Sequence, residues 1–189
     1  MRHIDRDSLA SEKRCMIVTP DIRLSCGLNM AYGLQFFDML TEELPKVLKT
    51  YSPADVSRQV ICGYQEGAYG AGYIGISRPE QYEKTVMISC GSLTEESAIR
   101  QDVRFENIFG PEKLNSGDLE EFELSHITEK SGNLPDIELV FGREDKYCSS
   151  AEAFSDYLKG KSKEEAEIRN GNVQWKDCYD ILKKRIVFK

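Results

Sequence analysis

Long apolar runs are missing from this sequence of 189 residues. No segment approaches the ~20 apolar residues that a transmembrane helix needs. Residues 1–7 are charged and lack the apolar stretch of a signal peptide. The length fits one domain with a core of its own. We therefore expect a globular cytoplasmic chain that has no membrane partner.

Basic clusters and metal-binding patterns are also scarce. The net charge is −7, and the densest basic run is residues 183–185, where cations suit the end of an expected helix. Nucleic-acid binders usually carry a basic patch, so no nucleic-acid partner is expected. None of the six cysteines forms a C-x-x-C pair and only two histidines are present. We expect no metal, no cofactor, and reduced thiols.

Apolar runs alternate with helical patterns, as is typical of parallel α/β proteins. Strands are expected at residues 15–19, 60–62, 85–90 and 137–141, with a weaker edge strand at 166–169. Helices are expected at residues 30–49, 67–77, 150–159 and 174–187. Residues 92–134 read as a helical excursion over the pocket side. The sequence thus predicts a single domain, residues 1–189, of three-layer α/β architecture with a mostly parallel sheet of about five strands.

One motif carries possible chemistry. Gly63, Gln65 and Gly67 follow a strand and open a helix, which is the setting of the G-x-S-x-G nucleophile elbow. Glycines at both outer positions would let the strand turn sharply into the helix. The central position holds Gln65 instead of serine. Taken alone, the motif is weak evidence for chemistry and favours a tight strand–helix turn without it.

Further motifs in the same order give the chain a family resemblance. It resembles the tributyrin esterases, relatives of esterase D (S-formylglutathione hydrolase), from Met16 to the C-terminus. The matching segments are residues 18–20, 32–45, 63–71, 78–82, 88–91 and 142–145. This resemblance implies a truncated α/β-hydrolase fold. It also implies that the family's N-terminal strands and oxyanion loop have no counterpart here.

The same resemblance places substitutions at the catalytic positions. The nucleophile position is Gln65, whose amide has no usable nucleophilic oxygen. The histidine position is Val173, while the acid position keeps Asp145. Without nucleophile, base and oxyanion loop, little of the mechanism remains, so no catalytic residue is expected. We expect the strained backbone at Gln65 to have relaxed and Asp145 to cap backbone amides of its turn.

Three functional hypotheses stay open at this point. The first is a non-catalytic relative that binds a partner chain or a small ligand. The second is a carboxylic-ester hydrolase with relocated residues, for which Glu66, Asp145 and His126 are the candidates. Cys148 and Cys178 would need an electropositive partner to act as nucleophiles. The third is a remnant that only associates with itself.

The edge of the sheet gives a separate expectation. In the family layout the third strand lies between the fourth, residues 15–19, and the fifth, residues 59–63, and that third strand is not encoded. We expect residues 15–19 to pair directly with residues 59–63 through a right-handed crossover. This leaves an apolar edge at Cys15–Thr19, which invites another chain. A homodimer or a protein partner covering this edge is therefore predicted.

Overall fold

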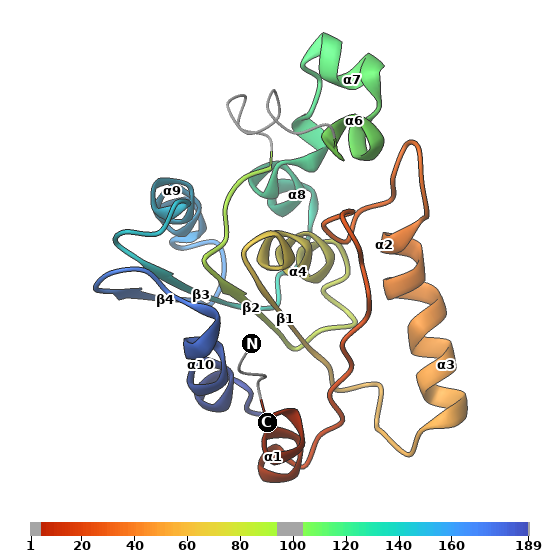
Figure 1. The fold of residues 1–189 in the computed structure, drawn as a ribbon, viewed down its shortest axis with the longest axis vertical. Coiled ribbons are helices and arrows are strands. Elements are labelled where there is room, and N and C mark those ends of the chain that lie inside the picture. Colours follow the sequence, from red (N-terminus) through yellow and green to blue (C-terminus); the bar gives the residue numbers. More distant parts are fainter. Residues whose placement is uncertain (1–4, 94–103, 189) are drawn as a thin grey trace.

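The structure, a computed structural model, describes residues 5–93 and 104–188. Its centre is a sheet of four parallel strands in the order β1-β2-β3-β4 (Figure 1). The strands are β1 Val60–Tyr64, β2 Lys84–Ile88, β3 Asp136–Gly142 and β4 Glu164–Arg169. Parallel strands need crossover connections, and the helices that supply them pack on one face of this sheet, whereas the other face is covered by a helix that follows the last strand.

The helices and helical turns surround the sheet as follows. In chain order they are α1 Arg6–Lys13, α2 Phe36–Asp38, the π-helical segment η1 Met39–Glu43, α3 Leu44–Tyr51, α4 Glu66–Ser77, α6 Arg104–Phe109, α7 Pro111–Ser116, η2 Glu120–Phe122, α8 Leu124–Lys130, α9 Cys148–Leu158, η3 Trp175–Asp177 and α10 Cys178–Arg185. In Figure 1, α4 lies on one face of the sheet and α10 on the other. The result is a three-layer α/β fold.

Burial of both faces explains the apolar strand sequences. On β2, Met87 packs into the core cluster that includes α4, α8 and α9. Its neighbours Val86 and Ile88 pack into the opposite cluster with Cys178 and Ile181 of α10. Successive residues of a strand point to opposite faces, so a strand covered on both sides is apolar at nearly every position.

The predicted elements compare well with the structure from residue 60 onward. The expected strands at 60–62, 85–90, 137–141 and 166–169 are β1 to β4, and the mostly parallel α/β fold is confirmed. The helix expected at 30–49 begins only at Phe36 and passes through η1. Part of the excursion, residues 94–103, lies outside the described residues, and its described part carries α6 to α8. Helix α1 was not predicted.

The expected first strand is wrong. Residues 15–19 form no strand and do not pair with residues 59–63, so the sheet has four strands instead of about five. Arg14 ends α1 with a left-handed φ of 50°, and the amide of Cys15 donates back to the carbonyl of Ala10. The chain then leaves in an extended path that a cavity separates from β1. In Figure 1 this stretch passes the β1 side of the sheet on its way to α2.

Candidate functional site

The turn between β1 and α4 keeps a strained backbone. Gln65 has φ 54° and ψ −120°, in a region that side-chain-bearing residues rarely occupy. Our expectation that this strain had relaxed is wrong. The turn is fixed because the Gln65 amide donates to Ile88 O (2.9 Å) and its carbonyl accepts from the amides of Ala68 (2.9 Å) and Tyr69 (3.2 Å). Neighbouring structure therefore holds the conformation without a serine.

The two glycines of the motif differ in their roles. A Cβ placed on Gly63 would lie 1.9 Å from the carbonyl oxygen of Gly67, so no other residue fits at that position. A Cβ on Gly67 would meet nothing within 4 Å. Only Gly63 is required by the close approach of strand and helix. The sequence motif alone does not distinguish the two glycines.

Asp145 is held in the turn after β3 by three hydrogen bonds. Its Oδ2 accepts from Ser89 Oγ (2.6 Å) and from the amide of Gly142 (2.7 Å). Its Oδ1 accepts from the amide of Val173 (2.8 Å). These donors come from the end of β2, the end of β3 and the segment before η3. The carboxylate therefore joins three parts of the chain that meet at the carboxyl edge of the sheet.

Val173 lies close to the turn, but its side chain points elsewhere. The side chain is 4% exposed and packs in the apolar cluster beneath the sheet with Ile88 and Val140. Its carbonyl accepts from the Tyr64 hydroxyl (3.1 Å), and that hydroxyl accepts from Gln65 Nε2 (3.3 Å). Hydrogen bonds thus connect Gln65, Val173 and Asp145 in sequence. Of the groups in this series of hydrogen bonds, only the Asp145 carboxylate can act as a general base, and it lies at the end remote from Gln65.

The fallback candidates have other partners. Glu66, at the start of α4, forms an ion pair with Arg104 (3.4 Å). His126, on α8, lies with Nδ1 3.1 Å from Glu120 Oε1. Within the described residues, no hydrogen bond or ion pair connects either side chain to Asp145. The structure therefore does not bring Glu66, His126 and Asp145 together as one catalytic group.

The two thiols near the acid and histidine positions are poor nucleophiles. Burial raises the pKa of Cys178 to about 12. Desolvation, followed by the charge of Glu152, raises the pKa of Cys148. A thiol reacts as the thiolate, so a raised pKa lowers its reactivity at neutral pH. In the described part of the chain, no group of three or more potential side-chain ligands could hold a metal ion. No described helix is long and apolar enough to cross a bilayer.

Comparisons with known proteins place the fold. No family model and no curated protein sequence matches the chain. Among solved structures, it is similar to FphF, a fluorophosphonate-binding serine hydrolase of Staphylococcus aureus. The two share 20% identity with a TM-score of 0.83, over 97% of this chain and 74% of FphF. It is also similar to the S-formylglutathione hydrolase FrmB of the same species, at 21% identity and TM-score 0.81 over 97% and 74% of the two chains.

A third similar structure is an S-formylglutathione hydrolase of Agrobacterium tumefaciens. It shares 17% identity with a TM-score of 0.68, over 86% of this chain and 61% of that one. About a quarter or more of each of these three proteins therefore has no counterpart among the 189 residues. At such low identities the similarity establishes the fold and not the activity. The chain has the esterase-like α/β-hydrolase fold and spans 61–74% of the length of these three proteins.

Proposed function

We propose that this protein is a non-catalytic relative of the esterase-like α/β-hydrolases that works by binding. The observation behind this proposal concerns two residues. Gln65 occupies the strained turn after β1, and the side chain of Val173, in the segment before η3, is buried beneath the sheet. Neither position offers a nucleophile or a base. Triad members act as a unit, so losing one costs about as much as losing several.

The retained acid supports the same proposal. Asp145 binds three donors that belong to the fold, so its presence needs no catalytic explanation. A carboxylate in this setting serves as an acceptor for backbone amides at a turn. We therefore propose a structural role for Asp145.

Hydrolysis of p-nitrophenyl acetate and butyrate by the purified chain tests the proposal, with FphF as the positive control. We expect no rate above background. The variant Gln65→Ser should also stay at background, because a serine placed there still lacks a base. A saturable activity would overturn the proposal. If Glu66→Gln or a correctly folded Asp145→Asn abolished that activity, it would establish the alternative, a carboxylic-ester hydrolase with relocated residues.

Binding requires a surface, and the side of the molecule near Cys15–Thr19 is the favoured one. Met16 and Val18 are 43% and 39% exposed and lie beside the open edge of the sheet. Exposed apolar groups next to a free edge are typical of interfaces. A homodimer or a protein partner at this side stays a prediction, as does a small-molecule ligand. Sedimentation at micromolar concentration tests self-association, and a monomer would rule out the homodimer.

A further inference from the structure

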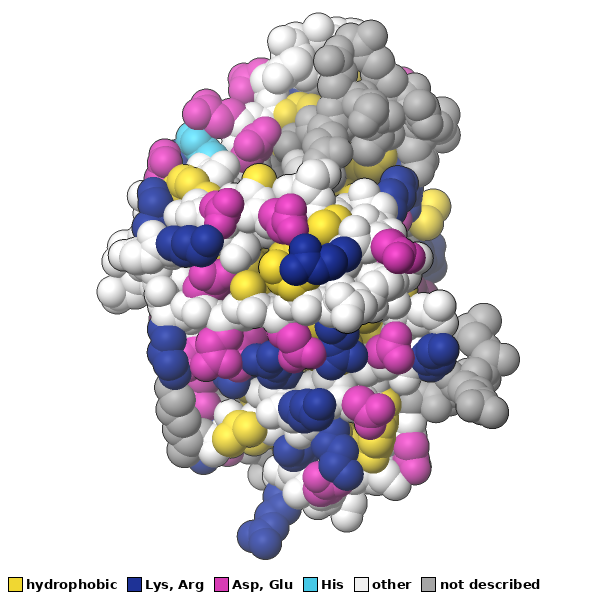
Figure 2. Space-filling view, turned by 90° about the vertical axis from the view of Figure 1, so that its left-hand side faces the viewer, with side chains coloured by type: hydrophobic (Ala, Val, Ile, Leu, Met, Phe, Trp, Pro, Cys, Tyr) yellow, Lys and Arg dark blue, Asp and Glu magenta, His cyan; other side chains and the backbone are white. Residues whose placement is uncertain are grey.

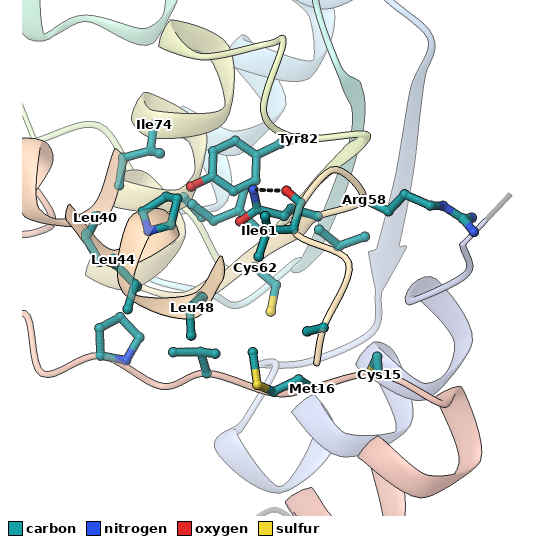
Figure 3. A pocket seen from close by; sticks show the side chains of 18 of the residues that line it. Cys15, Met16, Leu40, Leu44, Leu48, Arg58, Ile61, Cys62, Ile74 and Tyr82 are labelled. Carbon is teal, nitrogen blue, oxygen red and sulfur yellow. Dashed lines mark hydrogen bonds between the residues drawn. The ribbon is translucent and has the colours of Figure 1, made fainter. Parts of the chain in front are cut away.

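A cavity of about 810 Å³ lies along the free edge of β1 (Figure 3). We call it the edge cavity. The end of α1 and the segment that follows it, residues 13–22, line one side, and β1 with residues 53–59 lines the opposite side. Apolar side chains of α3 and α4 line the remaining walls, among them Leu44, Leu48 and Ile74. Figure 3 shows Cys62 and Met16 pointing toward each other across the cavity.

Within residues 5–93 and 104–188, both long walls present backbone groups without backbone partners. The carbonyl of Gln59 accepts from the amide of Glu83, and the amide of Gln65 donates to the carbonyl of Ile88. The backbone groups of the odd-numbered residues of this strand therefore point toward β2. The N–H and C=O groups of the alternate residues Val60 and Cys62 therefore point to the free edge. On the other wall, residues 16–19 make no backbone–backbone hydrogen bond within the described chain. Extended backbone on both sides of a cavity is the template to which another strand pairs.

The other edge of the sheet is protected. β4 has the sequence Glu-Glu-Ala-Glu-Ile-Arg, and charged side chains cover this side of the molecule (Figure 2). Arg185 forms ion pairs with Glu165 (3.2 Å) and Glu167 (2.6 Å), and Arg169 pairs with Glu167 (2.7 Å). Charges of this kind block pairing with further strands. β1 itself carries no charged side chain, although Lys13, Arg14, Asp55 and Arg58 also line the edge cavity, so the two edges differ in what they can accept.

The volume of the edge cavity fits a short strand. From the rise per residue, the spacing of strands and the spacing of layers, one strand residue occupies on the order of 160 Å³. The cavity therefore has room for about five residues. We propose that it accepts an extended apolar segment of another polypeptide, which pairs with β1 on one side and with residues 16–19 on the other. This is strand addition at a sheet edge.

Two other occupants fit the observations less well. An apolar small molecule would fill the volume but leave the backbone groups of both walls unpaired. A second copy of this chain would have to donate a free extended apolar segment. Within the described residues, the extended apolar stretch at 15–19 and Phe188 are themselves part of the cavity wall, Ile186 is 7% exposed, and Val187 is the exposed residue of the C-terminal stretch. These observations favour a segment of another polypeptide that reads as a buried strand, rich in valine and isoleucine.

The inference rests on the proposed binding function, but its test does not use ester hydrolysis, so either can fail alone. The probe is a fluorescein-labelled peptide with a core of about six valine and isoleucine residues, the usual strand length, between terminal lysines. Fluorescence anisotropy should show saturable binding. Hydrogen exchange followed by mass spectrometry should show protection of the amides at residues 15–19 and 60–64, and none at β4. Binding without that protection would overturn the proposal.

Two variants separate backbone pairing from apolar contact. Cys62→Pro removes an N–H that points to the free edge, which an edge strand tolerates, and should weaken peptide binding about tenfold. Cys62→Ala, the matched control, should bind as the original chain does. If the proline variant fails to fold, the same peptide with N-methylated core amides should lose binding to the unaltered chain.

The competing occupants give different results. Lauric acid that binds and displaces the peptide, combined with unchanged binding of the N-methylated peptide, would favour an apolar ligand and overturn the proposal. A dimer in sedimentation with residues 15–19 and 60–64 protected in the absence of peptide would favour a second copy and also overturn it. Absence of any peptide binding would do the same.

Discussion

Replacing Asp145 with alanine should destabilise the fold strongly. The change leaves the buried amides of Gly142 and Val173 without the carboxylate that accepts from them at 2.7 and 2.8 Å. Each buried donor that loses its partner costs about 1–3 kcal/mol, whereas the Ser89 hydroxyl can rotate to another acceptor. We expect a loss of about 3 kcal/mol in the free energy of unfolding. For a chain of this size that corresponds to a Tm lower by about 6–12 °C.

Thermal unfolding followed by circular dichroism measures this loss, and urea titration gives the free energy. Asp145→Asn keeps one acceptor oxygen, so its free energy of unfolding should lie between those of Asp145→Ala and the original chain. The control is Asp156→Ala, which removes an exposed helix carboxylate paired with Lys159 and should leave Tm nearly unchanged. A Tm for Asp145→Ala equal to that of the original chain would refute the structural role. Because the original chain is expected to be inactive, stability is the property in which the variant should differ from it.

Four further changes test the turn and the charged edge. Gly63→Ala should prevent stable folding because its Cβ would lie 1.9 Å from Gly67 O. Gly67→Ala should instead raise the free energy of unfolding by about 0.4–1 kcal/mol, because nothing lies near its Cβ. Equal effects of the two variants in urea titration would contradict the different roles of the two glycines. Gln65→Gly should raise it by about 1 kcal/mol by relieving the backbone at φ 54°, and a lower Tm would count against strain. The hydrogen bond from Arg185 lowers the pKa of Glu167 in the folded protein. The ionised carboxylate therefore stabilises the fold fully above the ordinary pKa of 4.5, and this stabilisation is lost as the pH falls through the lower pKa of the folded state. Glu167→Gln should therefore lose less stability on acidification, which urea titration at several pH values measures.

The sequence predicted the sheet best where local pattern and tertiary environment agree. Residues 85–90 and 137–141 are apolar at nearly every position because both faces of the central strands are covered, and this leaves a strong signal. β4 gives a weak signal because its side chains are mostly charged. Its pairing with β3 and with Arg185 decides its conformation. Local sequence does not contain those contacts.

The failure at residues 15–19 has a different cause. The segment Cys15-Met16-Ile17-Val18-Thr19 has high strand propensity, but propensity does not provide a neighbour at hydrogen-bonding distance. α1 ends at Lys13, and a cavity lies between the segment that follows and β1. An apolar run with high strand propensity can thus lie outside the sheet.

The resemblance equates Gln65, Asp145 and Val173 with catalytic positions of the esterases, but the geometry of these residues was not predictable from the pattern. The strain at Gln65 persists because Ile88, Ala68 and Tyr69 hold its backbone through hydrogen bonds that are independent of the side chain. A substitution at this position therefore changes the chemistry and leaves the turn intact. The reverse holds for Asp145, since its side chain itself makes the contacts that join β2, β3 and the segment before η3.

This difference bears on the three positions that the resemblance equates with a triad. Glutamine at position 65 costs the fold no contact that serine would make. Valine at position 173 adds an apolar side chain to a buried cluster, where the removal of water contributes about 1.5–3 kcal/mol. Alanine in place of Asp145 would leave two buried amides unpaired. Stability alone thus favours an aspartate at position 145 and is compatible with glutamine at 65 and valine at 173, so the presence of Asp145 carries no weight as a sign of hydrolysis.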